Sequence, residues 1–123
     1  NLRKNLPIQV FNKGNMMRDF TYIDDVVLGI IKVLKTKFKK NHEILNIGKG
    51  KPDKLMDLIK YLEKFYKKKF KIKFTKNIPI GDIKNTFSNT SKAKKIIKWI
   101  PKVNLENGIE KFVKWYKLDN GIK

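Results

Sequence analysis

Cysteine is absent from this sequence, and histidine occurs once, at His42. The lack of cysteine excludes disulfide bonds, thiolate catalysis and zinc ribbons, and it is compatible with the cytoplasm. A single histidine excludes a histidine-based metal cluster and a Ser-His-Asp triad. We therefore expect a cytoplasmic protein with no metal site.

Long apolar runs are also missing, because the longest extend over only a few residues. Runs of this length are too short for a transmembrane helix, so no membrane partner is expected. No apolar stretch follows Asn1 as it would in a signal peptide, and the absence of an initial Met leads us to expect a piece of a longer protein. With 41% hydrophobic residues, 123 residues suffice for one domain with a core.

Arginine is scarce although the net charge is +19, because only Arg3 and Arg18 are arginine and the other basic residues are all lysine. A high positive charge commonly indicates a nucleic-acid partner. A specific reader of bases and phosphates would be expected to use more arginine, whose planar side chain donates paired hydrogen bonds. The lysines are spread along the whole chain, so we interpret them as a solvated surface and expect no specific nucleic acid.

Hydrophobic periodicity predicts a mixed α/β fold. Alternating apolar residues indicate strands, and apolar residues three and four apart indicate amphipathic helices. The predicted strands cover residues 6–11, 19–22, 43–47 and 71–74, and the predicted helices cover about residues 24–35, 55–67, 91–97 and 105–118. We expect Asp24 to cap the first helix, and we assign Asp24 and Asp25 together to N-terminal capping and dipole compensation rather than to acid–base catalysis. Thr90 or Ser91 should cap the third helix.

Five motifs follow one another along the chain. The longest is R-D-F-T-Y-I-D-D-V-V, which begins at Arg18. The others are L-N-I-G from Leu45 with the helix from Leu55, G-D-I from Gly81 with Thr86, S-K-A from Ser91, and a closing segment from Gly108 to Tyr116. In this order they resemble the extended short-chain dehydrogenases/reductases that act on nucleotide sugars. The resemblance is strongest to UDP-glucuronate 4-epimerases of the capsular-polysaccharide type, in the NAD-dependent epimerase/dehydratase family.

The resemblance covers nearly the whole chain but only the C-terminal part of such an enzyme. It implies that residues 1–123 are a single partial domain, the nucleotide-sugar substrate-binding region of an NAD(P)-binding Rossmann-type enzyme whose Rossmann half is missing. The parent enzyme would be an isomerase of polysaccharide biosynthesis. It would epimerise a UDP-sugar through transient oxidation at C4.

Two motifs of the family are absent, namely the G-x-x-G-x-x-G dinucleotide turn and the catalytic Y-x-x-x-K. Gly48 and Gly50 form a lone G-x-G, with Asp53 where a third glycine would stand, which we interpret as a plain turn. NAD is therefore implied for the parent enzyme and no cofactor for this chain alone. We predict that the isolated chain has no catalytic residue and no activity.

The resemblance implies four substrate-binding residues. Main-chain groups near Gln9 would hydrogen-bond the uracil, and Phe11 would stack on it. Arg18 would bind the diphosphate, since a planar fork suits two phosphate oxygens, and Asp82 would accept hydrogen bonds from the ribose hydroxyls.

Each of these residues has a simpler alternative role. Phe11 would then be a core residue, and Asp82 would only cap the turn after a glycine. Arg18 would form a surface salt bridge to Asp19 or Asp24. The sequence leaves these alternatives open.

The implied partners are a UDP-sugar and either the missing N-terminal Rossmann half or a complementary chain, with a homodimer as the alternative. Elements that pack on such a half would otherwise be uncovered, so we expect an exposed apolar patch. Two other classes of protein stay open, namely a stand-alone nucleotide-sugar binding module and a basic nucleic-acid-binding protein.

Overall fold

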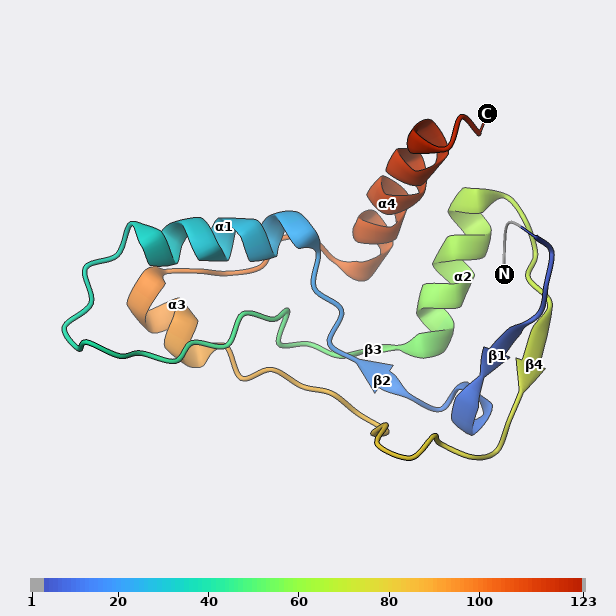
Figure 1. The fold of residues 1–123 in the computed structure, drawn as a ribbon, viewed down its shortest axis with the longest axis horizontal. Helices are drawn as coiled ribbons and strands as arrows, with labels where there is room; N and C mark the ends of the chain where they lie inside the picture. The colour runs from blue at the N-terminus through green and yellow to red at the C-terminus, as the bar shows by residue number, and fades with distance from the viewer. Residues whose placement is uncertain (1–3, 123) are drawn as a thin grey trace.

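The computed structural model describes residues 4–122 as a mixed α/β fold, which confirms the predicted fold class (Figure 1). Short strands are interspersed with helices along the chain, and a 3-10 turn follows the first strand. The elements are β1 (Ile8–Val10), η1 (Phe11–Gly14), β2 (Met17–Arg18), α1 (Ile23–Leu34), β3 (Asp53–Lys54), α2 (Leu55–Tyr66), β4 (Ile72–Phe74), α3 (Ser91–Ile97) and α4 (Leu105–Asp119).

The strands form two small sheets within the described part of the chain. β1 and β4 are parallel, whereas β2 and β3 are antiparallel with Arg18 opposite Asp53. β1 is shorter than the predicted strand at residues 6–11. The difference arises because Asn12 and Lys13 have φ angles of 48° and 51°, which turn the chain into η1 directly after Val10.

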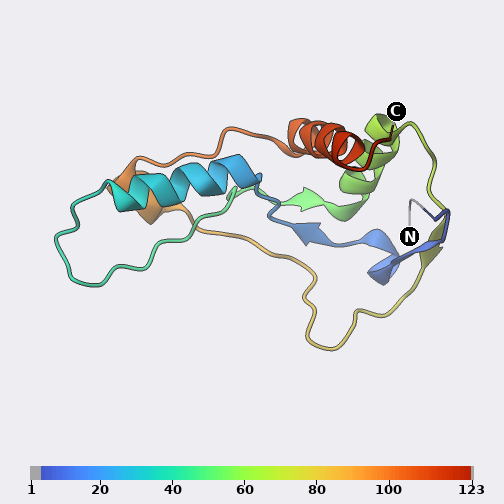
Figure 2. The same cartoon turned by 45° about the horizontal axis from the view of Figure 1, so that its top comes forward.

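The helices cluster at two ends of the molecule. α1 and α3 lie at one end, whereas α2 and both sheets lie at the other, with α4 alongside α2 (Figures 1 and 2). The rings of Tyr66 and Tyr116 join α2 to α4, with their centroids 6.4 Å apart. At the α1–α3 end, buried Ala93, Ile97 and Trp99 form the core, against which half-buried Val33, Phe38, Leu45, Ile47 and Ile96 pack.

The predicted capping role of Asp24 is wrong. α1 begins at Ile23 with Tyr22 as its N-cap residue, so Asp24 already lies inside the first turn and makes no capping hydrogen bond. Asp25 is buried and connects α1 to the segment before α4. Its Oδ2 accepts hydrogen bonds from the backbone N–H groups of Lys102 (3.0 Å) and Val103 (2.9 Å).

The predicted N-cap residue of α3 is confirmed, although no side-chain cap bond accompanies it. Thr90 is the N-cap residue, but its side chain makes no cap hydrogen bond. The N–H of Ser91 donates instead to Oδ1 of Asn89, at 3.1 Å. In α4 the ordinary arrangement holds, because the side chain of Asn104 accepts from the N–H of Asn107 at 2.8 Å.

Two predicted strands do not form. Residues 19–22 have no assigned secondary structure, and the N–H of Asp19 donates to the hydroxyl of Thr86 rather than to a strand partner. Residues 43–47 are irregular, and no other described segment lies beside them as a strand partner. Leu45 and Ile47 nevertheless pack against the α3 core. The apolar side chains of this segment are therefore packed against the core although its backbone forms no β-ladder with another described strand.

Replacing Asp25 by alanine should destabilise the chain, because the backbone N–H groups of Lys102 and Val103 would lose their buried acceptor. An unsatisfied buried donor costs about 1–3 kcal/mol, so we expect Asp25→Ala to lower the free energy of unfolding by about 2–4 kcal/mol in urea titrations. Asp24→Ala is the matched control. Asp24 is exposed, and surface changes of this kind stay within about 0.5 kcal/mol. Equal effects of the two substitutions would contradict this assignment.

Candidate nucleotide-binding site

Arg18 and Asp82 meet although they are 64 residues apart in sequence. Nη2 of Arg18, at the end of β2, lies 2.6 Å from Oδ1 of Asp82. Nη1 donates to the carbonyl oxygens of Met17 (2.9 Å) and Lys84 (3.1 Å). The alternative ion pairs with Asp19 and Asp24 are not formed. The structure therefore joins two of the four predicted site residues directly to each other.

The Arg18–Asp82 ion pair is weak and leaves N–H groups of Arg18 without a partner among the described residues. The side chains of Arg18 and Asp82 are 22% and 39% exposed, and an exposed pair of this kind contributes only about 0–1 kcal/mol. The bonds made to described residues use three of the five guanidinium N–H groups. Two remain for an anion, so a phosphate could bind Arg18 beside Asp82 or in its place.

Backbone hydrogen bonds explain why Asp82 reaches Arg18. The N–H of Met17 donates to the carbonyl of Lys84 at 3.0 Å, and the N–H of Thr86 donates to the carbonyl of Met17 at 3.2 Å. Residues 82–88 are thereby aligned along β2. At the tip of this loop Gly81 has a φ of 85°, a conformation that favours glycine, and Oδ1 of Asp82 accepts from the N–H of Ile83.

Asp19 fixes this arrangement from the other side of β2. Its Oδ2 accepts hydrogen bonds from the N–H groups of Gly50 and Ser88, both at 2.9 Å. A Cβ at Gly48 would stand 2.6 Å from the Cβ of Ser88, so only glycine permits this approach. The other oxygen of Asp19, Oδ1, is buried and has no hydrogen-bond partner among the described residues. One carboxylate thus links three loops beside Arg18.

From the sequence, Asp19 was predicted only as an alternative salt-bridge partner of Arg18. Its neighbour Thr21 was equally unassigned, yet the hydroxyl of Thr21 accepts from the N–H of Lys49 at 2.9 Å. The available signal was position, since both polar residues alternate with aromatic ones within the R-D-F-T-Y motif. Their distant partners were not visible from that pattern.

Gln9 and Phe11 lie on a neighbouring part of the molecule. Gln9 is exposed in β1 opposite Lys73 of β4, and Phe11 is half-buried at the start of η1. No hydrogen bond or ion pair among the described residues joins them to Arg18 or Asp82. Half-burial of Phe11 is compatible both with a core role and with a ring that has one free face.

A hollow of about 400 Å³ lies where the parallel strands β1 and β4 end. It is lined by Lys13, Phe74, Thr75 and Lys76. The hydroxyl of Thr75 is buried and has no partner among the described residues, and Phe74 is 51% exposed. Carboxyl ends of parallel strands are common ligand positions in α/β proteins, and two ammonium groups there favour an anion.

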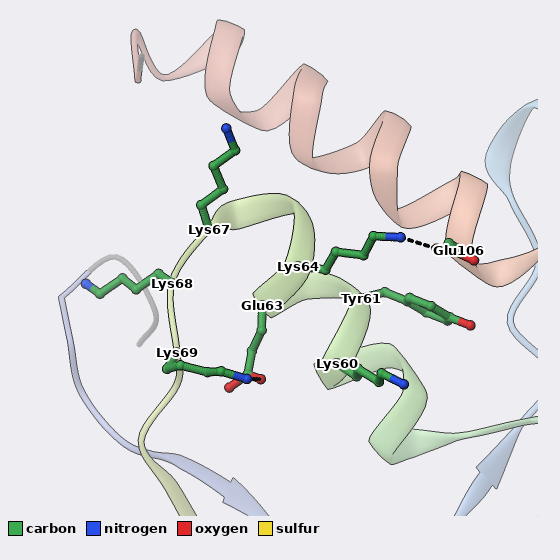
Figure 3. Close-up of a pocket in the computed structure, with 8 residues that line it drawn as sticks. All are labelled: Lys60, Tyr61, Glu63, Lys64, Lys67, Lys68, Lys69 and Glu106. Carbon is green, nitrogen blue, oxygen red and sulfur yellow. Dashed lines mark hydrogen bonds and ion pairs between the residues drawn. The ribbon is translucent and has the colours of Figure 1, made fainter.

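A larger hollow of about 650 Å³ lies between the end of α2 and the start of α4 (Figure 3). Five lysines line it, but their ammonium groups point in different directions rather than towards one point. Two of them are paired, Lys64 with Glu106 at 2.6 Å and Lys69 with Glu63 at 2.8 Å. The hydrogen bond with Lys69 lowers the pKa of Glu63, and the hydrogen bond with Glu106 raises the pKa of Lys64. We interpret this hollow as a solvated lysine surface.

The sequence of residues 1–48 matches the model of the NAD dependent epimerase/dehydratase family. Over these residues the chain is similar to that family. It is 45% identical over 89% of its length to an uncharacterised protein of Methanocaldococcus jannaschii, of which it covers 32%. It is 40% identical over 90% of its length to a UDP-glucuronate 4-epimerase of Thermodesulfobacterium geofontis, of which it covers 33%. The chain thus spans about a third of these relatives.

The fold agrees with this similarity. A UDP-glucuronic acid 4-epimerase from Bacillus cereus, solved with UDP-glucuronic acid and NAD, superposes with a TM-score of 0.81. It is 34% identical, and the match covers 94% of this chain and 37% of that one. Within residues 4–122 no helix is long and apolar enough to cross a bilayer, and no cluster of three or more potential metal ligands is found.

Asp19→Ala should destabilise the loops at Gly50 and Ser88 that the Asp19 carboxylate holds. It would leave the N–H groups of Gly50 and Ser88 without their acceptor, so we expect a loss of about 2 kcal/mol or more in unfolding free energy. Amide hydrogen exchange should become faster at residues 48–50 and 86–88. Asp119→Ala, at the exposed end of α4, is the control. Unchanged exchange at both loops in Asp19→Ala would show that Asp19 does not hold them.

Proposed function

We propose that this chain is the UDP-binding part of an NAD-dependent nucleotide-sugar 4-epimerase of the UDP-glucuronate or UDP-glucose type. The observation that carries the proposal is Arg18, held by three hydrogen bonds at the head of the family motif with N–H groups left to donate. The proposal includes a cytoplasmic location and a role in polysaccharide biosynthesis. It treats residues 1–123 as one partial domain, the nucleotide-sugar region.

Arg18 would bind the diphosphate of the nucleotide. Its guanidinium is already fixed by the carbonyl groups of Met17 and Lys84, so little side-chain entropy is lost on binding. A phosphate brings more negative charge than Asp82 and can accept two parallel hydrogen bonds. Asp82 would then accept from the ribose hydroxyls through its half-exposed carboxylate. The weak ion pair thus prepares both groups for one ligand.

The base would lie along the end of β1. Main-chain groups near Gln9 would bind the uracil, and the half-buried ring of Phe11 would stack on it. Stacking of a base on an aromatic side chain is worth about 1–3 kcal/mol in other proteins. The hollow at Lys13, Phe74, Thr75 and Lys76 supports this position, because it offers positive charge and an aromatic ring beside η1.

The chemical step would need groups that this chain does not contain. Its sequence has neither the G-x-x-G-x-x-G turn nor the Y-x-x-x-K pair, so we assign none of its residues to NAD or to proton transfer. The contribution of this chain would be to bind and orient the UDP-sugar. Alone it would bind the nucleotide without turning over the sugar.

UDP binding by calorimetry tests the proposal. Hydrogen bonds to charged groups contribute about 1.5–3 kcal/mol, so Arg18→Ala should weaken UDP at least tenfold, whereas Arg18→Lys should weaken it less. Lys114 is exposed on α4, so Lys114→Ala should bind UDP with the same affinity as the unchanged chain. If Arg18→Ala retained full affinity, the diphosphate would not bind at Arg18.

DNA titration separates this proposal from a nucleic-acid-binding role, which the net charge of +19 favours. Lysine contacts to phosphates weaken steeply with salt. We expect DNA binding at about 20 mM salt and its loss near 0.15 M, where the Debye length is about 8 Å and more distant charges are largely screened. Tight DNA binding that persisted at 0.15 M, together with no response to UDP, would favour the nucleic-acid role.

A further inference from the structure

A hollow of about 450 Å³ lies beside α3 and contains neither Arg18 nor Asp82. Three stretches of the chain line it, namely residues 49–53, the start of α3 with Thr90, and residues 99–104. We call it the α3 hollow. Its volume falls within the range of about 300–1,000 Å³ that is common for small-molecule sites.

Three lysines of the α3 hollow have no acidic partner. Lys51, Lys94 and Lys102 are exposed, and none of them forms an ion pair within residues 4–122. The carboxylate in the lining, Asp53, pairs with Lys49 instead. Three ammonium charges are therefore left uncompensated around one concave surface, and such a surface attracts anions.

The hydroxyl of Thr90 adds a neutral donor to the α3 hollow. Thr90 is the N-cap residue of α3, but its side chain makes no cap hydrogen bond. Among the described residues its hydroxyl has no other partner, and it is not one of the buried unpaired side-chain atoms. A hydroxyl that is neither buried nor paired within the protein can donate to an anion in the hollow.

The backbone around the α3 hollow is fixed by hydrogen bonds from outside it. Asp25 holds residues 99–104, because its Oδ2 accepts from the N–H of Lys102 at 3.0 Å and its carbonyl accepts from Nε1 of Trp99 at 2.8 Å. Asp19 holds the opposite wall through the N–H of Gly50 at 2.9 Å. A ligand would therefore find the walls already in place, which lowers the entropic cost of binding.

The α3 hollow differs in two respects from the larger hollow between α2 and α4. In the larger one, two of five lysines are paired and the ammonium groups diverge (Figure 3). The α3 hollow also has an apolar wall, where Ile100 is 53% exposed and Pro101 and Val103 are half-buried. A ligand that combines an anionic group with an apolar group would match both parts of the lining.

We propose that the α3 hollow binds an organic phosphate. The phosphate group lies among the three unpaired lysines and the hydroxyl of Thr90, and the apolar part of the ligand covers Ile100. A phosphate fits better than a carboxylate, because it carries up to two negative charges and three acceptor oxygens. Lysine is also a common phosphate-binding residue. The site is separate from Arg18 and does not depend on the proposed function.

Phenyl phosphate is the probe, and amide chemical shifts of this chain are the measurement. At about 0.15 M salt we expect saturable binding, with shifts at residues 49–51, 90–94 and 100–103. Arg18→Ala should bind the probe as the unchanged chain does. Inorganic phosphate lacks the apolar part and benzoate lacks the second charge, so each should bind at least about tenfold more weakly.

Substitutions in the lining test which side chains bind the probe. Thr90→Val removes only the hydroxyl and should weaken phenyl phosphate at least about fivefold. Its melting temperature should stay the same, because no cap bond is lost. Lys51→Ala combined with Lys94→Ala should weaken the probe at least about tenfold. Lys60→Ala combined with Lys68→Ala is the matched control, since it removes the same charge from the larger hollow.

Four results would overturn the proposal. They are the absence of saturable binding, equal effects of the two double substitutions, unchanged affinity in Thr90→Val, and binding of inorganic phosphate or benzoate as tight as that of phenyl phosphate. Loss of phenyl phosphate binding in Arg18→Ala would also overturn it, because the anion would then bind at Arg18. Failure of UDP to bind at Arg18 would leave the expected results for the α3 hollow unchanged, so the two proposals fail separately.

Discussion

The carboxylate of Asp19 is the contact on which the rest of the site depends. Through Oδ2 it accepts from two loops that are far apart in sequence, at Gly50 and Ser88. Its own N–H donates to Thr86, whose N–H in turn donates to the carbonyl of Met17. The loop that carries Asp82 is therefore held along β2. A short strand could not place a distant loop by side-chain packing alone.

The site holds Arg18 firmly but binds it weakly to its acidic neighbour. Two carbonyl oxygens fix the direction of the guanidinium, and the exposed carboxylate of Asp82 compensates its charge at small free-energy gain. A tighter, buried pair would resist replacement by a ligand, because separating it would leave an uncompensated charge in a buried site. Weak pairing on a rigid frame is thus compatible with reversible anion binding.

The α1 end of the molecule differs from the Arg18 site, because its exposed surface is apolar rather than charged. α1 packs on the core where Gly29 meets Trp99. Ile23, Ile30 and Leu34 on the same helix are more than half exposed. Within residues 4–122, the adjacent residues 43–47 make no backbone–backbone hydrogen bond. The polar site and the apolar surface are separate consequences of the same sequence.

The sequence predicted most elements because their signals are local. Apolar spacing located all four described α-helices to within a few residues, and glycine and asparagine marked the turn after β1. Prediction from the sequence failed where an element depends on contacts with a distant part of the chain. Residues 43–47 alternate like a strand, but a ladder needs a neighbour, and Asp24 resembles a cap, but the helix begins before it.

The sequence by itself determined the mixed α/β class and the similarity to the epimerase/dehydratase family, and it led to the prediction of a binding role for Arg18, because all three depend on residue identity and order. Only the tertiary structure decided that Arg18 pairs with Asp82, that Asp19 links the surrounding loops, and that Asp25 binds the segment before α4. The reason is sequence separation. These contacts join residues from 31 to 78 positions apart, and no local pattern specifies which distant backbone group a carboxylate will meet.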